Sequence, residues 1–410
     1  MTVPIAVTGV GVVAPGASNP QELWERAAAG RSPARLGDLF PGLAICSVEE
    51  SLDRSRVPAP RRAHRADRVV RMALLAAARA WQSAGMREGA YDPSRLGVVV
   101  GSSRGPVGKW EEATAYLSPD GLLRRTRPSL AADSMMGALH GSLASAFGVR
   151  GPAYTVSTAC ASGGHALALA ATQIAGGMAE IVLAGGADAP LNRCMIRQFL
   201  ATGILDPAQP PSPVCRPYDR TASGTVLGEA AAFFLLESAD SARRRGAPVL
   251  CWLAGWGMGA DGCLASPESA GAEALDASAS AALALAGTAL PDIGYLNTHG
   301  TGTQVNDAIE MRWIHRLDSQ RASPLPFGST KAVTGHCLGA TPVLEAAICL
   351  ETLRRGLIPP SAHCVDPHPD APAGLVRQVA PLQGDHVLSV SLGFWGSACS
   401  LVLTRNPHQQ

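Results

Sequence analysis

The strongest constraint on the fold of this chain is a regular alternation of short apolar segments with alanine-rich ones. Several apolar segments end in glycine and are rich in β-branched residues, as buried strands are: residues 5–11, 96–101 and 181–186. The stretches between them include helical spacing at residues 72–84 and 163–174. Strands that alternate with helices in this way predict an α/β fold.

A second series of the same kind begins near residue 249. It contains predicted strands at 249–255, 293–297, 326–328, 386–391 and 400–404, and predicted helices at 272–286 and 343–353. No sequence repeat is strong enough to prove a duplication, but two similar αβ halves fit a length of 410 residues. We therefore expect the halves to be residues 1–248 and 249–410.

Charge and composition exclude several classes of protein. The 34 basic and 33 acidic residues give a net charge of +1, which argues against a nucleic-acid partner. Only 16% of the residues are charged and 47% are hydrophobic, so the chain has a large buried core and is not disordered.

No segment has the pattern of a membrane anchor or a signal peptide. The longest uncharged run, residues 277–291, is too short to cross a bilayer, so we expect no membrane partner. The apolar start has no basic residue before it and no small-residue cleavage site, which indicates a strand. Ten cysteines without paired spacing then predict reduced thiols in a cytoplasmic protein.

Cys160 lies at a predicted turn from a strand to a helix. A β-branched stretch leads into it, and small residues after it open an alanine-rich helix that runs to about Gly176. The free amides and positive dipole end of that helix would lower the pKa of the thiol and favour a nucleophilic thiolate. A buried structural cysteine is the alternative, and the turn alone does not decide between the two.

Two histidines stand in loops rich in glycine and threonine. His299 follows the predicted strand 293–297, and His336 comes after the strand 326–328. Open α/β sheets bind ligands at the carboxyl ends of their strands, so both are candidate site residues, although each fits a structural role as well. Lys331, one of two lysines beside 32 arginines, lies close enough in sequence to His336 to influence its protonation.

Together, these motifs resemble the β-ketoacyl synthase family of condensing enzymes, which has the thiolase fold. The resemblance covers essentially the whole chain, and its motifs occur in order at residues 7–11, 158–163, 216–219, 228–229, 299–303, 306–307, 329–331, 334–336 and 393–394. Any one motif is weak, but their order and spacing are hard to obtain by chance. The resemblance implies a thiolase-like fold, with two similar αβ halves in αβαβα layers.

The activity implied by this resemblance is a decarboxylative Claisen condensation. Cys160 would hold the acyl group as a thioester, and its backbone amide with that of Phe394 would form the oxyanion hole. His299 and His336 would act as neutral imidazoles that donate hydrogen bonds to the malonyl thioester oxygen and stabilise the enolate. Lys331 would support this histidine pair.

Further site residues follow from the same resemblance. Glu345, in the adjoining helix, would also support the histidines, and Thr301 and Thr303 would bind the pantetheine amides. The resemblance implies no metal and no redox cofactor. Phosphopantetheine is carried by the partner, an acyl carrier protein. The glycine-rich loops match neither a dinucleotide-binding nor a P-loop motif.

The resemblance also implies two protein partners. An acidic acyl carrier protein needs a basic landing surface, and the family's docking segment falls at about Arg61 to Arg65, although an arginine-rich solvated loop is the alternative. Family members are usually dimers. The apolar region 146–157 is a candidate edge for pairing with a second copy or with a related subunit.

One loop departs from the family pattern. Gly393, Phe394, Trp395 and Gly396 stand where the family usually has Gly-Phe-Gly-Gly, in a loop that gates the acyl pocket. An indole in this loop either fills space or restricts its movement. With the altered stretch 222–225, Trp395 predicts a synthase of specialised polyketide or fatty-acid metabolism, with a pocket for an unusual acyl group such as a polyene or an aromatic.

The sequence leaves two alternatives to this condensing enzyme. The chain is alternatively a non-catalytic partner subunit, as chain-length factors are, although such subunits usually lack the nucleophile that Cys160 supplies. It is alternatively an acyltransferase or a thioester hydrolase, which would use the same cysteine without forming a carbon–carbon bond.

Overall fold

The centre of the structure is one mixed sheet of ten strands, in the order β11-β10-β14-β15-β9-β1-β8-β6-β4-β5. The structure, a computed structural model, describes residues 4–52, 65–87, 89–114, 127–208, 214–262 and 272–406. One side of the sheet is built by β1 (Ile5–Val13), β4 (Leu96–Gly101), β5 (Ala153–Val156), β6 (Ile181–Asp188) and β8 (Ala230–Ser238). The other side is built by β9 (Cys251–Ala260), β10 (Ile293–Asn297), β11 (Phe327–Gly328), β14 (His386–Gly393) and β15 (Ser397–Thr404).

The two sides of the sheet repeat the same topology. On one side β4 is parallel to both β5 and β6, and on the other β10 is parallel to both β11 and β14. The last strand of each side, β8 or β15, is antiparallel to both of its neighbours. Antiparallel pairing of β1 with β9 joins the two sides, so two similar αβ halves share one sheet.

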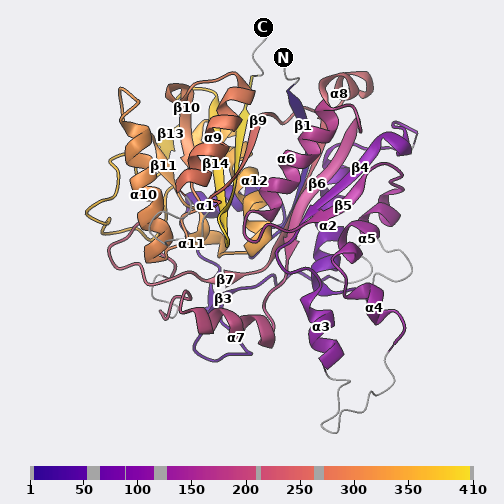
Figure 1. The fold of residues 1–410 in the computed structure, drawn as a ribbon, viewed down its shortest axis with the longest axis horizontal. Coiled ribbons are helices and arrows are strands. Elements are labelled where there is room, and N and C mark those ends of the chain that lie inside the picture. Colours follow the sequence, from indigo (N-terminus) through magenta and orange to yellow (C-terminus); the bar gives the residue numbers. More distant parts are fainter. Residues whose placement is uncertain are drawn as a thin grey trace.

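Helices complete five layers around and between the halves (Figure 1). The outer layers are α2 (Arg68–Ser83) and α5 (Gly137–Phe147) on the N-terminal strands, and α9 (Ala272–Ala286) and α10 (Gln304–Asp318) on the C-terminal strands. The middle layer is formed by α6 (Ser162–Ala175) and α12 (Thr341–Arg355), which lie between the indigo-to-magenta and the orange-to-yellow halves. The predicted α/β class and its αβαβα layering are therefore confirmed.

Shorter elements connect this framework. The helical ones are α1 (Pro20–Ala28), α3 (Val107–Thr114), α4 (Leu130–Asp133), α7 (Arg193–Thr202), α8 (Ala239–Arg245), α11 (Lys331–Thr334), and the 3-10 turns Pro93–Arg95, Leu290–Asp292 and Leu338–Ala340. The short strands are β2 (Arg35–Leu36), β3 (Ala44–Cys46), β7 (Leu227–Gly228), β12 (Leu357–Ile358) and β13 (Ala380–Pro381). The boundary predicted between residues 248 and 249 falls in the loop from α8 to β9.

The predicted strands and helices occur where the sequence places them, with shifts of a few residues at their ends. The analysis of the sequence does not identify β8, although this strand lies near the middle of the sheet. Its run Ala-Ala-Ala-Phe-Phe-Leu-Leu is apolar throughout, because both faces of β8 are covered. Without alternation, such a run is not distinguishable from a buried helix by its periodicity.

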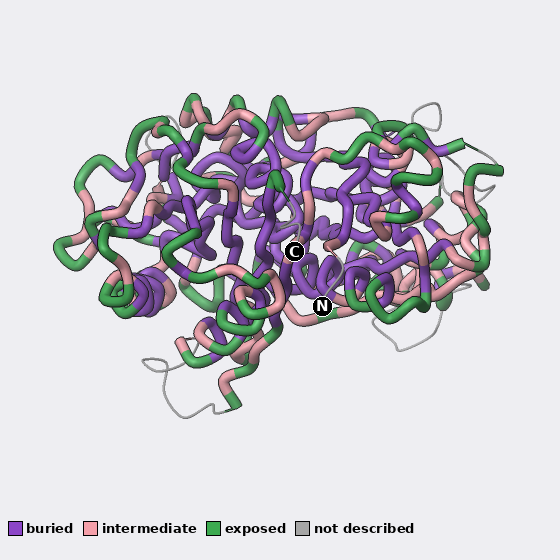
Figure 2. Tube along the Cα trace, turned by 90° about the horizontal axis from the view of Figure 1, so that it is seen from above, coloured by how far each residue is buried: buried purple, intermediate pink, exposed green. Residues whose placement is uncertain are grey.

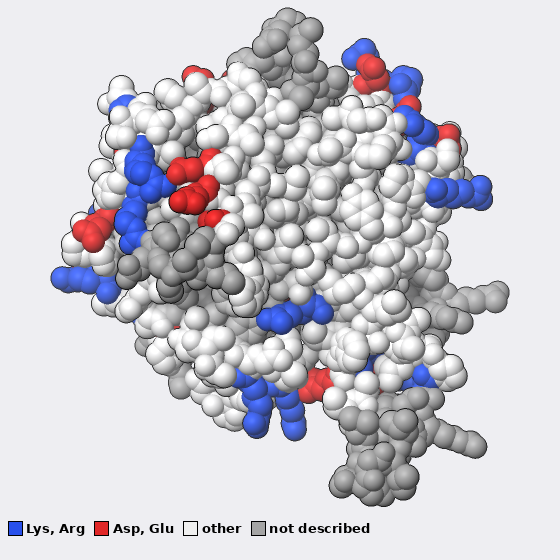
Figure 3. Space-filling view, in the orientation of Figure 1, with Lys and Arg blue, Asp and Glu red and all other residues white. Residues whose placement is uncertain are grey.

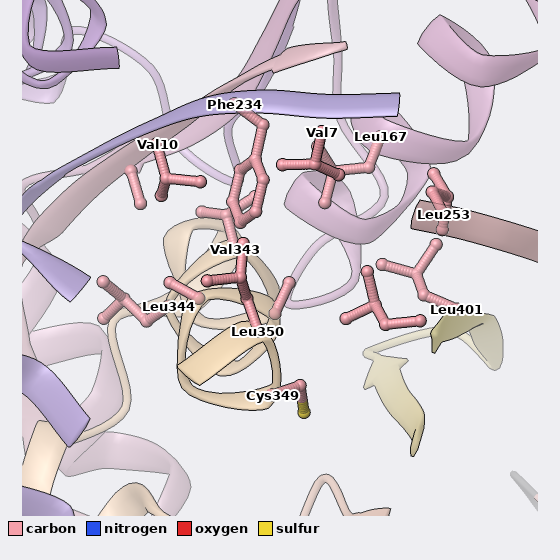
Figure 4. Packing of buried hydrophobic residues seen from close by; sticks show 14 of the residues in the cluster. Val7, Val10, Leu167, Phe234, Leu253, Val343, Leu344, Cys349, Leu350 and Leu401 are labelled. Carbon is pink, nitrogen blue, oxygen red and sulfur yellow. The ribbon is translucent and has the colours of Figure 1, made fainter. Parts of the chain in front are cut away.

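The main hydrophobic core lies between the two halves. Val343 and Leu350 of α12 point into the same apolar interior as Val7 of β1, Phe234 of β8 and Leu401 of β15 (Figure 4). Buried residues fill the interior of both halves, and exposed ones form the outer rim (Figure 2). Within the part of the chain that the structure describes, no helix combines the length and the apolar character needed to span a bilayer.

The core predicts a large cost for removing Phe234, whose side chain is 1% exposed. We expect Phe234→Ala to lower the free energy of unfolding by about 3 to 5 kcal/mol, because the lost burial is accompanied by a cavity. Urea unfolding followed by circular dichroism measures this change. Val249→Ala, in an exposed loop position, is the control and should change stability by less than about 0.5 kcal/mol. Equal effects of the two substitutions would contradict this location of the core.

Candidate active site

Cys160 lies in the sharp turn that connects β5 to α6. Ala159, directly before it, has a φ of 49°, in the left-handed region that is unfavourable for a residue with a Cβ. The Ser162 hydroxyl donates to the Ala159 carbonyl over 2.6 Å and accepts from the Thr158 amide over 2.9 Å. These bonds fix the turn, and the strand-to-helix turn predicted from the sequence is confirmed.

Cys160, His299 and His336 line one cavity of about 610 Å³. Their exposed fractions are 4%, 5% and 4%, so all three side chains are buried. The imidazole rings of His299 and His336 are nearly perpendicular, with 5.4 Å between their centroids. The three residues follow β5, β10 and β11, so the carboxyl ends of strands from both halves meet at this cavity.

Two carboxylates of α10 hold the loop that carries His299. Glu310 accepts the backbone N–H of His299 over 2.7 Å and that of Gly300 over 2.6 Å. Asp307 accepts the next two amides of the loop over 3.1 Å and 3.2 Å. Burial raises the pKa of Glu310 to about 7 and that of Asp307 to about 6. The sequence motif at residues 306–307 includes Asp307, but Glu310 is not predicted as a site residue. Acidic residues in the first turns of a helix after a glycine-rich loop are a sequence signal that could have identified it.

Lys331 and Glu345 form a fully buried ion pair beneath the histidines. The Lys331 ammonium donates to Glu345 Oε1 over 2.6 Å and also to the backbone carbonyl of His299. Burial raises the pKa of Glu345 to about 7, while the charge of Lys331 opposes that rise. Lys331 therefore contacts the main chain of one histidine and fixes its position.

Both histidines are neutral at neutral pH, as the family resemblance implies. Burial and the charge of Lys331 lower the pKa of His299 well below its usual value and that of His336 to about 3. The Nδ1 atom of His336 lies 3.1 Å from the Thr341 hydroxyl. A hydroxyl that donates to Nδ1 leaves the ring proton on Nε2, the other nitrogen of the imidazole.

The predicted lowering of the Cys160 pKa is wrong. Burial raises the pKa of the thiol to about 12, and this effect exceeds the lowering by the charges of Lys331 and Arg104. The backbone N–H of Phe394 donates to the sulfur. This hydrogen bond lowers the pKa of Cys160, but by less than burial raises it. The sequence indicates that Cys160 lies at a helix terminus, but it does not show how completely the thiol is buried. The prediction therefore leaves out the cost of desolvating the thiolate, which raises the pKa.

The loop between β14 and β15 closes one side of the cavity. Gly393, Phe394, Trp395 and Gly396 all line it, and the Phe394 amide faces Cys160 as described above. Trp395 has a φ of 70° and an exposed fraction of 82%, so its indole stands at the mouth and does not fill the interior. A tryptophan in the left-handed region is a strained element of this loop.

The remaining predicted residues are partly placed. Thr301 and Thr303 line the cavity, with 2.7 Å between their hydroxyl oxygens. Arg65 is exposed, and Arg61 lies outside the described residues. Arg68, from the same basic stretch, is engaged in an ion pair of 2.7 Å with Glu229. Among the described residues, no group of three or more His, Cys, Asp or Glu side chains is arranged to hold a metal ion.

Two family models match the chain. The model described as "Beta-ketoacyl synthase, N-terminal domain" matches residues 2–242, and the model described as "Beta-ketoacyl synthase, C-terminal domain" matches residues 250–365.

Relatives of similar length include proteins of Streptomyces and Rhizobium. The tetracenomycin polyketide synthase ketoacyl synthase alpha subunit of Streptomyces glaucescens is 32% identical, over 98% of this chain and 97% of the relative. Nodulation protein E of Rhizobium sp. (strain N33) is 33% identical, over 92% of each chain.

Solved structures share the whole fold. The ishigamide ketosynthase/chain length factor superposes with a TM-score of 0.88 at 28% identity, over 99% of this chain and 100% of that one. A type II PKS acyl-carrier protein in complex with its ketosynthase bound to the hexaketide gives a TM-score of 0.87 at 25% identity, with the same coverage.

The pH dependence of Cys160 alkylation tests the raised pKa. Between about pH 6 and about pH 9 we expect the alkylation rate by iodoacetamide to rise about tenfold per pH unit without a plateau, because the thiolate fraction grows throughout this range. Peptide mass spectrometry measures the rate at Cys160 itself. Cys160→Ser provides the background, and a plateau near neutral pH would show instead that the thiolate is stabilised.

Proposed function

Because the chain belongs to the β-ketoacyl synthase family, we propose that Cys160, His299 and His336 carry out that family's reaction in the cavity they share. The protein is a condensing acyltransferase, which joins an acyl group to the carbon of a malonyl thioester as carbon dioxide leaves. The observation that supports these residue assignments is the meeting of one thiol and two neutral imidazoles in a single buried cavity.

The first step is transfer of the acyl group to Cys160. The sulfur attacks the carbonyl carbon of the incoming thioester as the thiol gives up its proton, and the departing pantetheine sulfur takes up a proton when its bond to the acyl group breaks. The amides of Cys160 and Phe394 donate to the oxyanion of the tetrahedral intermediate. The hydrogen bond from the Phe394 amide to the sulfur supports this role, because the donor lies next to the reacting atom.

The second step is decarboxylation and condensation. The bond from the malonyl carbon to its carboxylate breaks, carbon dioxide leaves, and the electron pair forms an enolate whose oxygen accepts N–H donors from His299 and His336. The enolate carbon attacks the carbonyl carbon of the acyl group on Cys160, the bond to the cysteine sulfur breaks, and the thiolate takes up a proton from water. Neutral rings suit this role, because each retains one N–H donor and neither titrates near pH 7.

The substrates are proposed to arrive on an acyl carrier protein, whose phosphopantetheine arm supplies the thioester. Arg65 is the described part of the proposed docking surface. Thr301 and Thr303 line the cavity, which supports the proposal that they bind the pantetheine amides. The solved ketosynthase in complex with an acyl-carrier protein supports this proposal by similarity. No metal or redox cofactor is required for these steps.

A second subunit is proposed to pair along β5, the last strand of the sheet on the N-terminal side. All four residues of Ala153–Val156 are half-buried, and within the described residues β5 pairs only with β4. An edge strand of this kind is a pairing surface. A copy of this chain or a related ketosynthase-like subunit fits it, and the solved ketosynthase/chain length factor supports such an assembly.

The alternative of a non-catalytic chain-length-factor-like subunit is not favoured, since relatives over the whole length are ketosynthases and the cavity retains Cys160. Specialised polyketide or fatty-acid synthesis is the proposed context of the reaction. Trp395 at the mouth, and Ser223 and Thr225 in the cavity wall, support a reshaped acyl pocket.

The two steps are separable by mutation. We expect Cys160→Ala to abolish acylation, and His336→Ala to reduce malonyl decarboxylation by about a hundredfold while acylation persists, because only the enolate loses a donor. Intact mass follows acylation, and released carbon dioxide follows decarboxylation. Acyl-Cys160 that forms in the unmodified protein without any extended product would instead indicate acyl transfer or hydrolysis.

Thr341 is predicted to fix the tautomer of His336. With the Thr341 hydroxyl as the donor to Nδ1, Thr341→Val should lower the decarboxylation rate about tenfold, because Nδ1 can then carry the ring proton and Nε2 loses its hydrogen for part of the time. Thr341→Ser retains the hydroxyl and is the matched control. An unchanged rate in Thr341→Val, with acylation also unchanged, would contradict this role.

A further inference from the structure

A second cavity, of about 620 Å³, lies beside the reaction cavity. The helix α7 borders both, because its buried Phe199 lines the reaction cavity while its exposed side lines the second one. The loop after β4 and the helix α3 complete the second cavity. Its lining residues are Ser103, Arg104, Val107, Trp110, Glu111, Thr114, Arg193, Cys194, Met195, Arg197 and Gln198.

Arg104 stands at the boundary between the two cavities. Its guanidinium carbon lies 5.7 Å from the centroid of the Phe199 ring, within the range of a cation–π contact. The main chain of Arg104 is anchored, since its amide donates to the buried Asp188 carboxylate over 3.0 Å. The charge of Arg104 also reaches the reacting sulfur, because it acts to lower the pKa of Cys160.

One nitrogen of the Arg104 side chain lacks an acceptor among the residues that the structure describes. Its Nε is buried and has no hydrogen-bond partner among the described residues. A buried donor without an acceptor is unfavourable, and native proteins rarely retain one without a reason. The side chain is therefore positioned for an acceptor that arrives from outside the described chain.

The second cavity is strongly basic. Three of its lining residues are arginines, Arg104, Arg193 and Arg197, and only Glu111 is acidic. For Arg193 and Arg197, as for Arg104, the described residues provide no side-chain ion pair. Basic side chains lie at the lower centre of the molecular face, over the region of α7 (Figures 1 and 3). The cavity therefore favours an anionic or oxygen-rich ligand.

The position of Cys160 relative to the cavity mouth indicates which part of a bound acyl group lies toward Arg104. Its mouth is marked by the exposed side chains of Trp395 and Val305, with Cys160 farther inside. Beyond the sulfur, Cys160 packs in one buried cluster with Ile196 and Phe199. An acyl group on Cys160 that points away from the mouth therefore meets this apolar cluster first, and Arg104 lies on the other side of Phe199.

We propose that Arg104 is a specificity residue that binds an oxygen acceptor at the distal end of the acyl group held on Cys160. The substrate class is an acyl chain with a carboxylate or a keto oxygen at that end, since either accepts hydrogen bonds from a guanidinium. A plain alkyl end leaves the arginine without an acceptor and is disfavoured, as polar sites reject analogues that lack the matching group. This inference rests on the proposed acylation of Cys160.

Acylation of Cys160 by three pantetheine thioesters of equal chain length tests the proposal. One thioester ends in a methyl group, one in a carboxylate, and one carries a keto group near its end. We expect the unmodified protein to react at least about tenfold faster with one of the oxygenated chains than with the alkyl chain, as an arginine-bound acceptor can provide. The oxygenated chain that reacts faster shows whether Arg104 binds a carboxylate or a keto oxygen.

Variants of Arg104 separate recognition from folding. Arg104→Leu should remove the preference by slowing the oxygenated chain while the alkyl chain reacts as before or faster. Arg104→Lys should retain part of the preference for a carboxylate. Arg243→Leu, at a position of 76% side-chain exposure on α8, is the matched control and should keep the full preference.

Each adverse outcome has a distinct meaning. Equal rates with all three thioesters, or an unchanged preference in Arg104→Leu, would overturn the role of Arg104 and leave the proposed function intact. A change in subunit assembly without a change in preference would show that Arg104 faces a partner chain, and would overturn it as well. If no thioester acylates Cys160 in the unmodified protein, the proposed function fails together with this inference.

Discussion

The chemistry of the cavity depends on the removal of its charged and titratable groups from water. Lys331 and Glu345 are fully buried against each other, and the Lys331 ammonium also holds the main chain at His299. The same burial lowers the pKa of both histidines and raises that of Cys160. A buried ion pair of this kind is a costly way to gain stability, and its clearest benefit here is a fixed electrostatic environment for neutral hydrogen-bond donors.

The repeated topology explains how such distant residues meet. Each half provides parallel strands whose carboxyl ends point to one region, and the β1–β9 pairing with the buried helices α6 and α12 holds the halves together. Cys160 comes from one half, and His299 and His336 come from the other. Catalysis of this kind therefore requires the whole fold, because neither half contains both the nucleophile and the histidine pair.

Reaction chemistry and substrate choice are handled by different parts of the cavity. The loops after the strand ends carry the thiol and the imidazoles, and two carboxylates of α10 fix the loop at His299. Trp395 stands at the mouth in a strained conformation, and Phe199 lines the cavity with Arg104 near its ring. We expect substitutions at these positions to change which acyl group fits without removing the groups that react.

The sequence by itself determined the α/β class, most strands of the central sheet, the four helices α2, α6, α9 and α12, and the candidates Cys160, His299 and His336, because these depend on local periodicity and on residue types in fixed order. It did not reveal β8, whose apolar run lacks a period, or the loop-holding role of Glu310. Only the tertiary structure decided the pKa of Cys160 and brought Arg104 against Phe199. Desolvation and contacts between distant segments arise from the packing of the whole chain, and no local stretch of sequence records them.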